Sequence, residues 1–116
     1  MSGYVYLASP YSHPEERVRN ERFVAACKKA AQYINKGIAV FSPIAQSHPV
    51  ADHMAEHKRM DYELWMKVDL PLVRMASELH VLCIDGWRQS RGVTREIEYA
   101  TLLGIPVKQV FLDVEP

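Results

Sequence analysis

Residues 79–104, LHVLCIDGWRQSRGVTREIEYATLLG, contain one complete unit of a strand, a loop and a helix. The apolar run at its start is ended by Asp85-Gly86, which predicts a strand followed by a turn. Apolar residues then recur at helical spacing from Val93 onward, and Gly104 is typical of a helix end. A strand that leads directly into a helix is the repeating unit of parallel α/β proteins.

The rest of the chain continues this alternation. Strands are predicted at residues 4–8, 38–41, 79–84 and 107–112, and helices at residues 14–35, 61–77 and 93–103. Residues 42–58 are expected to form a loop with a short helix, and Pro71 is expected to kink or restart the helix that contains it. Because no repeat, low-complexity segment or linker interrupts the pattern, residues 1–116 are expected to form a single domain.

The alternation also predicts the topology of the sheet. Strands connected through helices are parallel and have helices on both faces. Right-handed crossovers place the four strands most simply in the order 2-1-3-4. A crevice then opens at the carboxyl ends of strands one and three, lined by residues 8–14 and 85–92.

Composition excludes several classes of protein. Acidic and basic residues number 14 each, so no bulk positive charge gathers nucleic acid. The N-terminal apolar run is too short for a membrane span or a signal-peptide core. Cys27 and Cys83 lie in apolar segments and are expected to be buried, reduced thiols. We therefore expect a cytoplasmic protein that binds neither nucleic acid nor membranes.

Glu96 is the first candidate for chemistry. It follows the glycine-containing loop 85–92 by one helical turn, and backbone amides at such a helix start attract anions. The helix dipole there favours an ionised carboxylate, and an ionised carboxylate that faces a crevice is a candidate nucleophile. From its position alone, Glu96 is explained more simply as an acidic residue that stabilises the helix, an explanation that also fits Glu98.

Asp69 and Tyr6 are two further candidates, each with a structural alternative. Asp69 is flanked by Val68 and Leu70, and partial burial would raise its pKa and suit it to proton donation. Alternatively, it caps a helix that restarts at Pro71. Tyr6 can reach the crevice and hydrogen bond with a carboxylate, or it can pack as a core residue.

Three histidines raise the possibility of a metal site. His53 and His57 are one helical turn apart, but Met54 stands where the zinc-protease motif has a glutamate, and neither cysteine is close in sequence. No metal is therefore expected. His48 is expected to line the rim of the crevice or to pack on it.

Taken together, these segments resemble a known family. Tyr6-Leu7-Ala8-Ser9-Pro10, Asp69, and Ser90-x-Gly92-x-x-x-Glu96-Ile97-x-Tyr99-Ala100 resemble the nucleoside 2-deoxyribosyltransferase-like superfamily, which includes deoxynucleoside 5′-monophosphate N-glycosidases. The likeness spans nearly the whole chain in the same order. The run Gly86-Trp87-x-x-Ser90-x-Gly92 looks like that of a small, poorly characterised branch. The resemblance implies a three-layer α/β fold similar to flavodoxin and Rossmann folds.

The resemblance also implies roles for residues. Glu96 would attack the anomeric carbon of a deoxyribose, Asp69 would assist departure of the base, and Tyr6 would orient the nucleophile. Residues of the loops and the crevice rim would bind the nucleoside or nucleotide: Ser9, Gly86, Trp87, Ser90, Gly92 and His48. The implied activity is that of an N-glycosidase or N-deoxyribosyltransferase that needs no cofactor and forms a homo-oligomer, for which Trp65 and Trp87 would suit an interface.

This sequence also departs from the superfamily pattern. Ser9-Pro10 stands where a glycine is frequent, Glu98 replaces a small residue, and the basic residue that reads a 5′-phosphate is missing from the first loop, where Arg17 or Arg19 could substitute. The alternatives are a nucleotide-binding module of the same fold without turnover, and a partner-binding protein whose crevice is vestigial.

Overall fold

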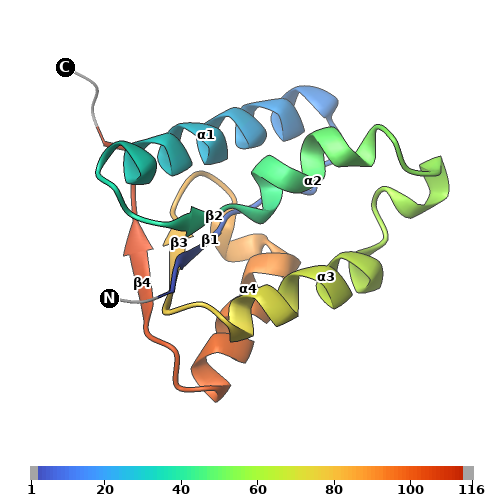
Figure 1. The fold of residues 1–116 in the computed structure, drawn as a ribbon. Helices are drawn as coiled ribbons and strands as arrows, with labels where there is room; N and C mark the ends of the chain where they lie inside the picture. The colour runs from blue at the N-terminus through green and yellow to red at the C-terminus, as the bar shows by residue number, and fades with distance from the viewer. Residues whose placement is uncertain (1–2, 114–116) are drawn as a thin grey trace.

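The structure, a computed structural model, describes residues 3–113 and consists of short strands separated by helices (Figure 1). The strands are β1 (Val5–Ala8), β2 (Val40–Phe41), β3 (Glu78–Leu82) and β4 (Val107–Val110). The α-helices are α1 (Glu16–Asn35), α2 (Pro43–Ala51), α3 (Tyr62–Arg74) and α4 (Arg91–Leu102), and two 3₁₀ helices are η1 (Glu56–Lys58) and η2 (Trp87–Gln89).

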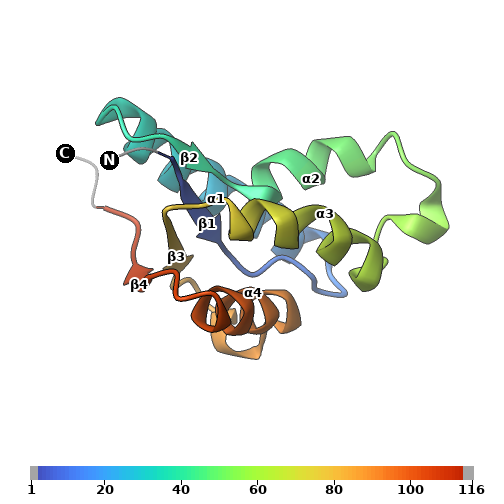
Figure 2. The same ribbon diagram turned by 60° about the horizontal axis from the view of Figure 1, so that its bottom comes forward.

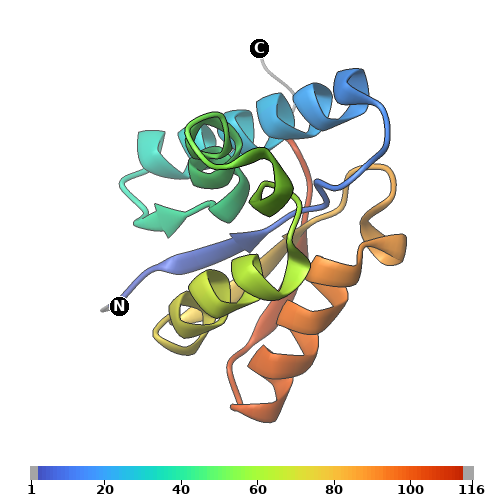
Figure 3. The ribbon, with the colours of Figure 1, turned by 90° about the vertical axis from the view of Figure 1, so that its right-hand side faces the viewer.

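The four strands form one parallel sheet in the order β2-β1-β3-β4, which confirms the predicted order. Tyr6 of β1 is in register with Phe41 of β2 on one side and with Leu79 of β3 on the other. Because β1 and β3 are parallel neighbours, the segments that follow them leave the same edge of the sheet, where they diverge (Figure 3).

Helices cover both faces of the sheet, as Figures 2 and 3 show. On one face, Val5 and Leu7 of β1 pack with Tyr33 of α1. On the other face, Tyr6 and Ala8 belong to a core cluster with residues of α3 and α4. The alternation of side chains along β1 therefore directs Tyr6 toward α3 and α4, away from α1.

One expectation about the helices is confirmed and one requires correction. Residues 42–58, expected to form a loop with a short helix, contain the nine-residue helix α2, whose start is capped by the Ser42 hydroxyl, which accepts a hydrogen bond from Ala45 N at 3.1 Å. Pro71 does not restart the third helix, because α3 is continuous through it. Pro71 is exposed, so water can hydrogen bond with the Lys67 carbonyl that proline leaves without a donor.

The expected burial of the cysteines is also wrong in part. Cys27 of α1 and Cys83, which directly follows β3, are both free thiols, but each is only half-buried. Burial still raises the pKa of both thiols. No helix within residues 3–113 is both long enough and apolar enough to cross a membrane.

Candidate active site

Tyr6 and Glu96 meet in the core between β1 and α4. The Tyr6 hydroxyl donates a hydrogen bond to Glu96 Oε2, although the two residues are 90 positions apart in sequence. Tyr6 is fully buried and Glu96 is 4% exposed. A buried carboxyl group that accepts a hydrogen bond from a buried phenol is a polar pair that the packing of an apolar core does not require.

Helix α4 places Glu96 by its start and by its buried face. The Ser90 hydroxyl caps the helix and accepts a hydrogen bond from Val93 N at 3.2 Å. Val93, Glu96 and Ala100 are the buried residues of α4, at the spacing of a single helix face. Glu96 therefore lies on the core side of α4, whereas Glu98 is exposed.

Helix α3 brings Asp69 to the same region. Asp69 is 7% exposed and lies with Met66 and Val73 on the buried face of α3. Its charge raises the pKa of both Glu96 and Tyr6, as expected of a neighbouring carboxylate. The alternative that Asp69 caps a restarted helix is wrong, because Asp69 is inside α3, and the cap of α3 is Asp61, which accepts from Leu64 N at 3.1 Å.

The pKa of the Glu96 carboxyl is raised to about 8: burial raises it most, the Tyr6 hydrogen bond lowers it, and the Asp69 charge raises it. Burial also raises the pKa of Asp69 to about 6. Burial therefore outweighs the helix dipole, which was expected to favour the ionised form of Glu96. Glu96 lies in the second turn of α4, beyond the reach of most of the dipole, and loss of hydration is the larger effect.

Three of the predicted binding residues, Ser9, Gly86 and Trp87, lie in the segments that follow β1 and β3 at the carboxyl edge of the sheet. Ser9 directly follows β1 and is 5% exposed. Gly86 has a φ of 89°, so a side chain there would strain the backbone, and its Cβ would lie 2.4 Å from Nη2 of Arg22, whose flexible side chain would have to shift. Trp87 is half-buried and packs against the core cluster that contains Tyr6.

Gly92 and His48 are less closely tied to the carboxyl pair. A Cβ at Gly92 would lie 3.8 Å from Met66 Cε, an ordinary contact, so local packing does not require glycine there. His48 of α2 stacks on Phe23 with ring centroids 4.1 Å apart, and its Nδ1 is 2.6 Å from the Tyr11 hydroxyl. These contacts fix His48 against α1 and the loop after β1, consistent with the packing interpretation.

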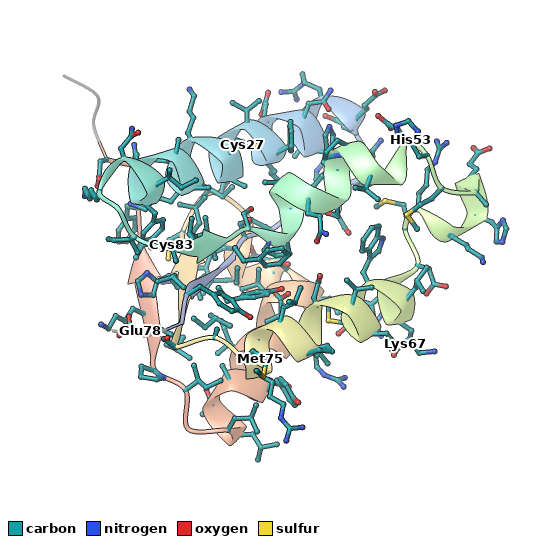
Figure 4. The ribbon with its side chains drawn as sticks, in the orientation of Figure 1. Cys27, His53, Lys67, Met75, Glu78 and Cys83 are labelled. Atoms are coloured by element: carbon teal, nitrogen blue, oxygen red, sulfur yellow. The ribbon has the colours of Figure 1, made fainter. Side chains whose placement is uncertain are left out.

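The remaining histidines give no metal site. His53 and His57 are exposed, and Figure 4 shows His53 beyond the end of α2, away from Cys83 and Glu78. Within residues 3–113, His, Cys, Asp and Glu side chains form no group of three or more that could hold a metal ion.

A hollow of about 400 Å³ lies beside the carboxyl edge on the α1 side. Its lining includes His13 from the loop after β1, and Ile84 and Asp85 from the segment after β3. Neither Tyr6 nor Glu96 lines it. Because both residues are almost completely covered, a molecule from solution can reach Glu96 only when neighbouring side chains move.

Sequence reasoning missed Phe41 as a neighbour of the site. Its ring centroid is 5.9 Å from that of Tyr6, at a tilt of 45°. The signal was present in the predicted strand order, since the second strand ends beside the first and an aromatic residue stands at its end.

Comparisons with known proteins agree with this architecture. The family described as a domain of unknown function, DUF1937, matches residues 3–111. A solved structure from the characterisation of the 2-deoxyribosyltransferase of the psychrotolerant bacterium Bacillus psychrosaccharolyticus is similar to this chain, with a TM-score of 0.67 and 23% sequence identity. The match covers 97% of this chain and 75% of that one, whereas no curated protein matches in sequence.

Proposed function

This chain belongs to the family described as domain of unknown function DUF1937, and on that premise we propose that it cleaves or exchanges the N-glycosidic bond of a nucleoside or nucleoside 5′-monophosphate. The observation that carries the proposal is the hydrogen bond from buried Tyr6 to buried Glu96, with Asp69 close enough to raise the pKa of both. The fold shared with a 2-deoxyribosyltransferase supports the same class of reaction.

Glu96 is the nucleophile in this proposal. Cleavage of an N-glycosidic bond builds positive charge on the sugar, and an anionic carboxylate below C1′ stabilises that charge. One oxygen of Glu96 forms a bond with C1′ while the bond from C1′ to the base nitrogen breaks and its electron pair stays on the base. Tyr6 holds Oε2 by its hydrogen bond, which leaves Oε1 for the attack.

Asp69 is the acid that protonates the leaving base. Its pKa of about 6 allows a protonated carboxyl group to persist closer to neutrality than at an exposed aspartate. Water then attacks C1′, the Glu96 carboxylate leaves, and Asp69 regains the proton, which completes hydrolysis to free sugar and free base. If a second base attacks in place of water, the product is a new nucleoside.

The proposed reaction requires one proton on this pair of carboxyl groups. Burial raises the pKa of both Glu96 and Asp69, so the pair keeps a proton at a higher pH than exposed carboxyl groups do. Attack requires that Glu96 is ionised and that Asp69 holds the proton.

Ser9, Gly86, Trp87, Ser90, Gly92 and His48 form the proposed binding surface for the substrate. Gly86 permits the left-handed turn that begins η2, and Ser90 sets the start of α4. The backbone amides of the first turn of α4 lie next to this loop and suit a polar or anionic group of the ligand. No metal or organic cofactor takes part in the proposed steps.

We also propose that the protein assembles as a homo-oligomer. Large apolar side chains are exposed on and near α3: Met60 is 52% exposed, Val68 43% and Met75 72%. Surfaces of this kind are typical of interfaces between subunits. Light scattering coupled to gel filtration measures the mass, and a monomer at micromolar concentration would contradict assembly.

The decisive experiment is incubation with a panel of nucleosides and their 5′-monophosphates, with free base measured by chromatography. A second base in the mixture distinguishes transfer, which yields a new nucleoside, from hydrolysis. Glu96→Gln is expected to abolish base release, whereas Glu98→Gln, two residues away on the exposed side of α4, is expected to retain it. A binding module without turnover would release no base in any of these reactions, and its affinity would survive Glu96→Gln.

A further inference from the structure

The Ser9 hydroxyl is buried without a hydrogen-bond partner. Ser9 is 5% exposed, and within residues 3–113 its Oγ is the one fully buried side-chain nitrogen or oxygen without a partner in the protein. A buried polar atom without a partner lowers stability, and native proteins leave few of them. Such an atom at a candidate site indicates a group kept for a ligand.

Two other serines at the same edge of the sheet show what is unusual about Ser9. Ser42 directly follows β2, precedes a proline as Ser9 does, and caps α2. Ser90 lies in the segment after β3 and caps α4. The cap of α1, in contrast, is Glu15, six residues beyond Ser9, so the Ser9 hydroxyl is left without a structural role at a helix start.

Ser9 occupies the position in the sheet where a ligand is expected. It follows β1 at the point where the chain segments after β1 and β3 diverge. Successive side chains of a strand alternate between the two faces of the sheet, so a ligand that contacts both Ser9 and the Tyr6–Glu96 pair would lie across the carboxyl end of β1.

The surroundings of Ser9 favour an uncharged ligand group. Its neighbours Ala8 and Pro10 are buried and apolar, and no charged group hydrogen bonds with its Oγ. The nearby guanidinium groups of α1 are already engaged with the loop after β1: Arg22 donates to Ser12 O at 2.9 Å, and Arg19 donates to His13 O at 2.5 Å. A phosphate is bound by several charged or backbone donors, whereas a hydroxyl or an amide requires only one neutral partner.

We propose that Ser9 Oγ is a specificity-determining group that hydrogen bonds with an uncharged hydroxyl, carbonyl or amide of a bound nucleoside. The proposal rests on the proposed function for its class of ligand. It adds that the ligand group beside β1 is neutral, and that Ser9 contributes to affinity through its hydroxyl and not through packing.

Calorimetric binding to the Glu96→Gln variant tests this without turnover. The ligands are a 2′-deoxynucleoside, the 2′,3′-dideoxynucleoside that lacks the 3′-hydroxyl, and the free base. Adding Ser9→Ala is expected to weaken binding of the deoxynucleoside by about 3- to 10-fold. If Ser9 contacts the 3′-hydroxyl, Ser9→Ala is expected to leave the affinity for the dideoxynucleoside unchanged. If Ser9 contacts the base, Ser9→Ala is expected to lower the affinity for the free base by the same factor as for the deoxynucleoside.

A matched variant and a second measurement separate ligand binding from folding. Ser42→Ala removes a hydroxyl that caps α2, and it is expected to lower the melting temperature while leaving affinity unchanged. Ser9→Ala is expected to keep or raise the melting temperature of the free protein, because it removes a buried atom without a partner. A lower melting temperature for Ser9→Ala with unchanged affinity would show a structural hydroxyl and overturn the proposal.

Measurements of base release distinguish a failure of the proposed function from a failure of the inference about Ser9. If the parent releases no base while Ser9→Ala weakens nucleoside binding, the proposed function fails and the inference about Ser9 stands. If the parent releases base and Ser9→Ala changes neither KM nor affinity, the proposed function stands and the inference fails. If no nucleoside binds to Glu96→Gln, the inference is overturned.

Discussion

The Tyr6 hydroxyl donates a hydrogen bond to Glu96 Oε2 and thereby joins the central strand β1 to helix α4. Both partners are buried, so neither can exchange the other for water without rearrangement. The bond selects one oxygen of Glu96 and stabilises its ionised form, while burial and the Asp69 charge oppose ionisation. The protonation of this pair therefore depends on three residues from three different elements.

Tyr6→Phe is expected to lower kcat/KM by roughly 10- to 100-fold, the value of a hydrogen bond to a charged group. Since the Tyr6 hydrogen bond lowers the pKa of Glu96, its loss is expected to move the upper limb of the pH–rate profile to higher pH. Tyr4→Phe is the control, because the Tyr4 hydroxyl donates to Leu72 O at the other end of the strand. An unshifted upper limb in Tyr6→Phe would show that the bond does not control Glu96.

The pH dependence of kcat/KM is expected to be bell-shaped, with limbs near 6 and 8. Below the lower limb both carboxyl groups are protonated and no nucleophile is present. Above the upper limb both are ionised and no acid remains to protonate the base. Initial rates of base release measured from pH 4.5 to 9.5 give both limbs, and a profile that only rises with pH would exclude an acid with the assigned role.

Asp69→Asn is expected to slow release of ordinary bases by at least about 100-fold, which is typical for loss of a general acid. A substrate whose leaving group departs without protonation is expected to be cleaved almost as fast as by the parent. The ratio of the two rates, measured for parent and variant, isolates the proton transfer from the packing of α3. Equal losses for both substrates would assign Asp69 to positioning.

Fold prediction succeeded because its signals are local and repeated. The apolar runs at residues 4–8 and 79–84, each ended by a turn, indicated neighbouring parallel strands, and the handedness of crossovers gave their order. The short helix expected within residues 42–58 is α2, but its bounds were not predicted, because Pro43 and Pro49 disfavour helices in general, although Pro43 occupies a first-turn position that proline tolerates.

The candidate site was only partly accessible to sequence reasoning. Order in the chain and the family resemblance brought Tyr6, Asp69 and Glu96 together, but the protonation of Glu96 depends on burial, which the sequence does not reveal. For that reason, the helix dipole predicted a lowered pKa for Glu96, whereas burial raises it. The vacant hydroxyl of Ser9 also required coordinates, because Ser9-Pro10 and Ser42-Pro43 look alike in sequence while only Ser42 caps a helix.

The last prediction concerns folding stability, which is expected to fall as the pH rises from about 4.5 to about 8. The pKa of Glu96 is raised from its ordinary value of 4.5 to about 8, so the folded protein holds a proton that the unfolded chain has lost over this range. The stabilisation from this proton is complete below the unfolded pKa and disappears as the pH passes the folded pKa. A shift of this size corresponds to roughly 3 to 5 kcal/mol between pH 4.5 and 8.

Glu96→Gln removes the titrating group and keeps a side-chain oxygen that can accept from the Tyr6 hydroxyl. Its free energy of unfolding, measured in urea at pH 5 and pH 8, is expected to vary less with pH than that of the parent and to exceed it at pH 8. The free energy of unfolding of Glu96→Gln is still expected to fall somewhat as the pH rises, because the pKa of Asp69 is raised from 3.8 to about 6. Glu98 is exposed, so the free energy of unfolding of Glu98→Gln is expected to vary with pH as that of the parent does. If Glu96→Gln also showed the pH dependence of the parent, Glu96 would be ionised in the folded protein.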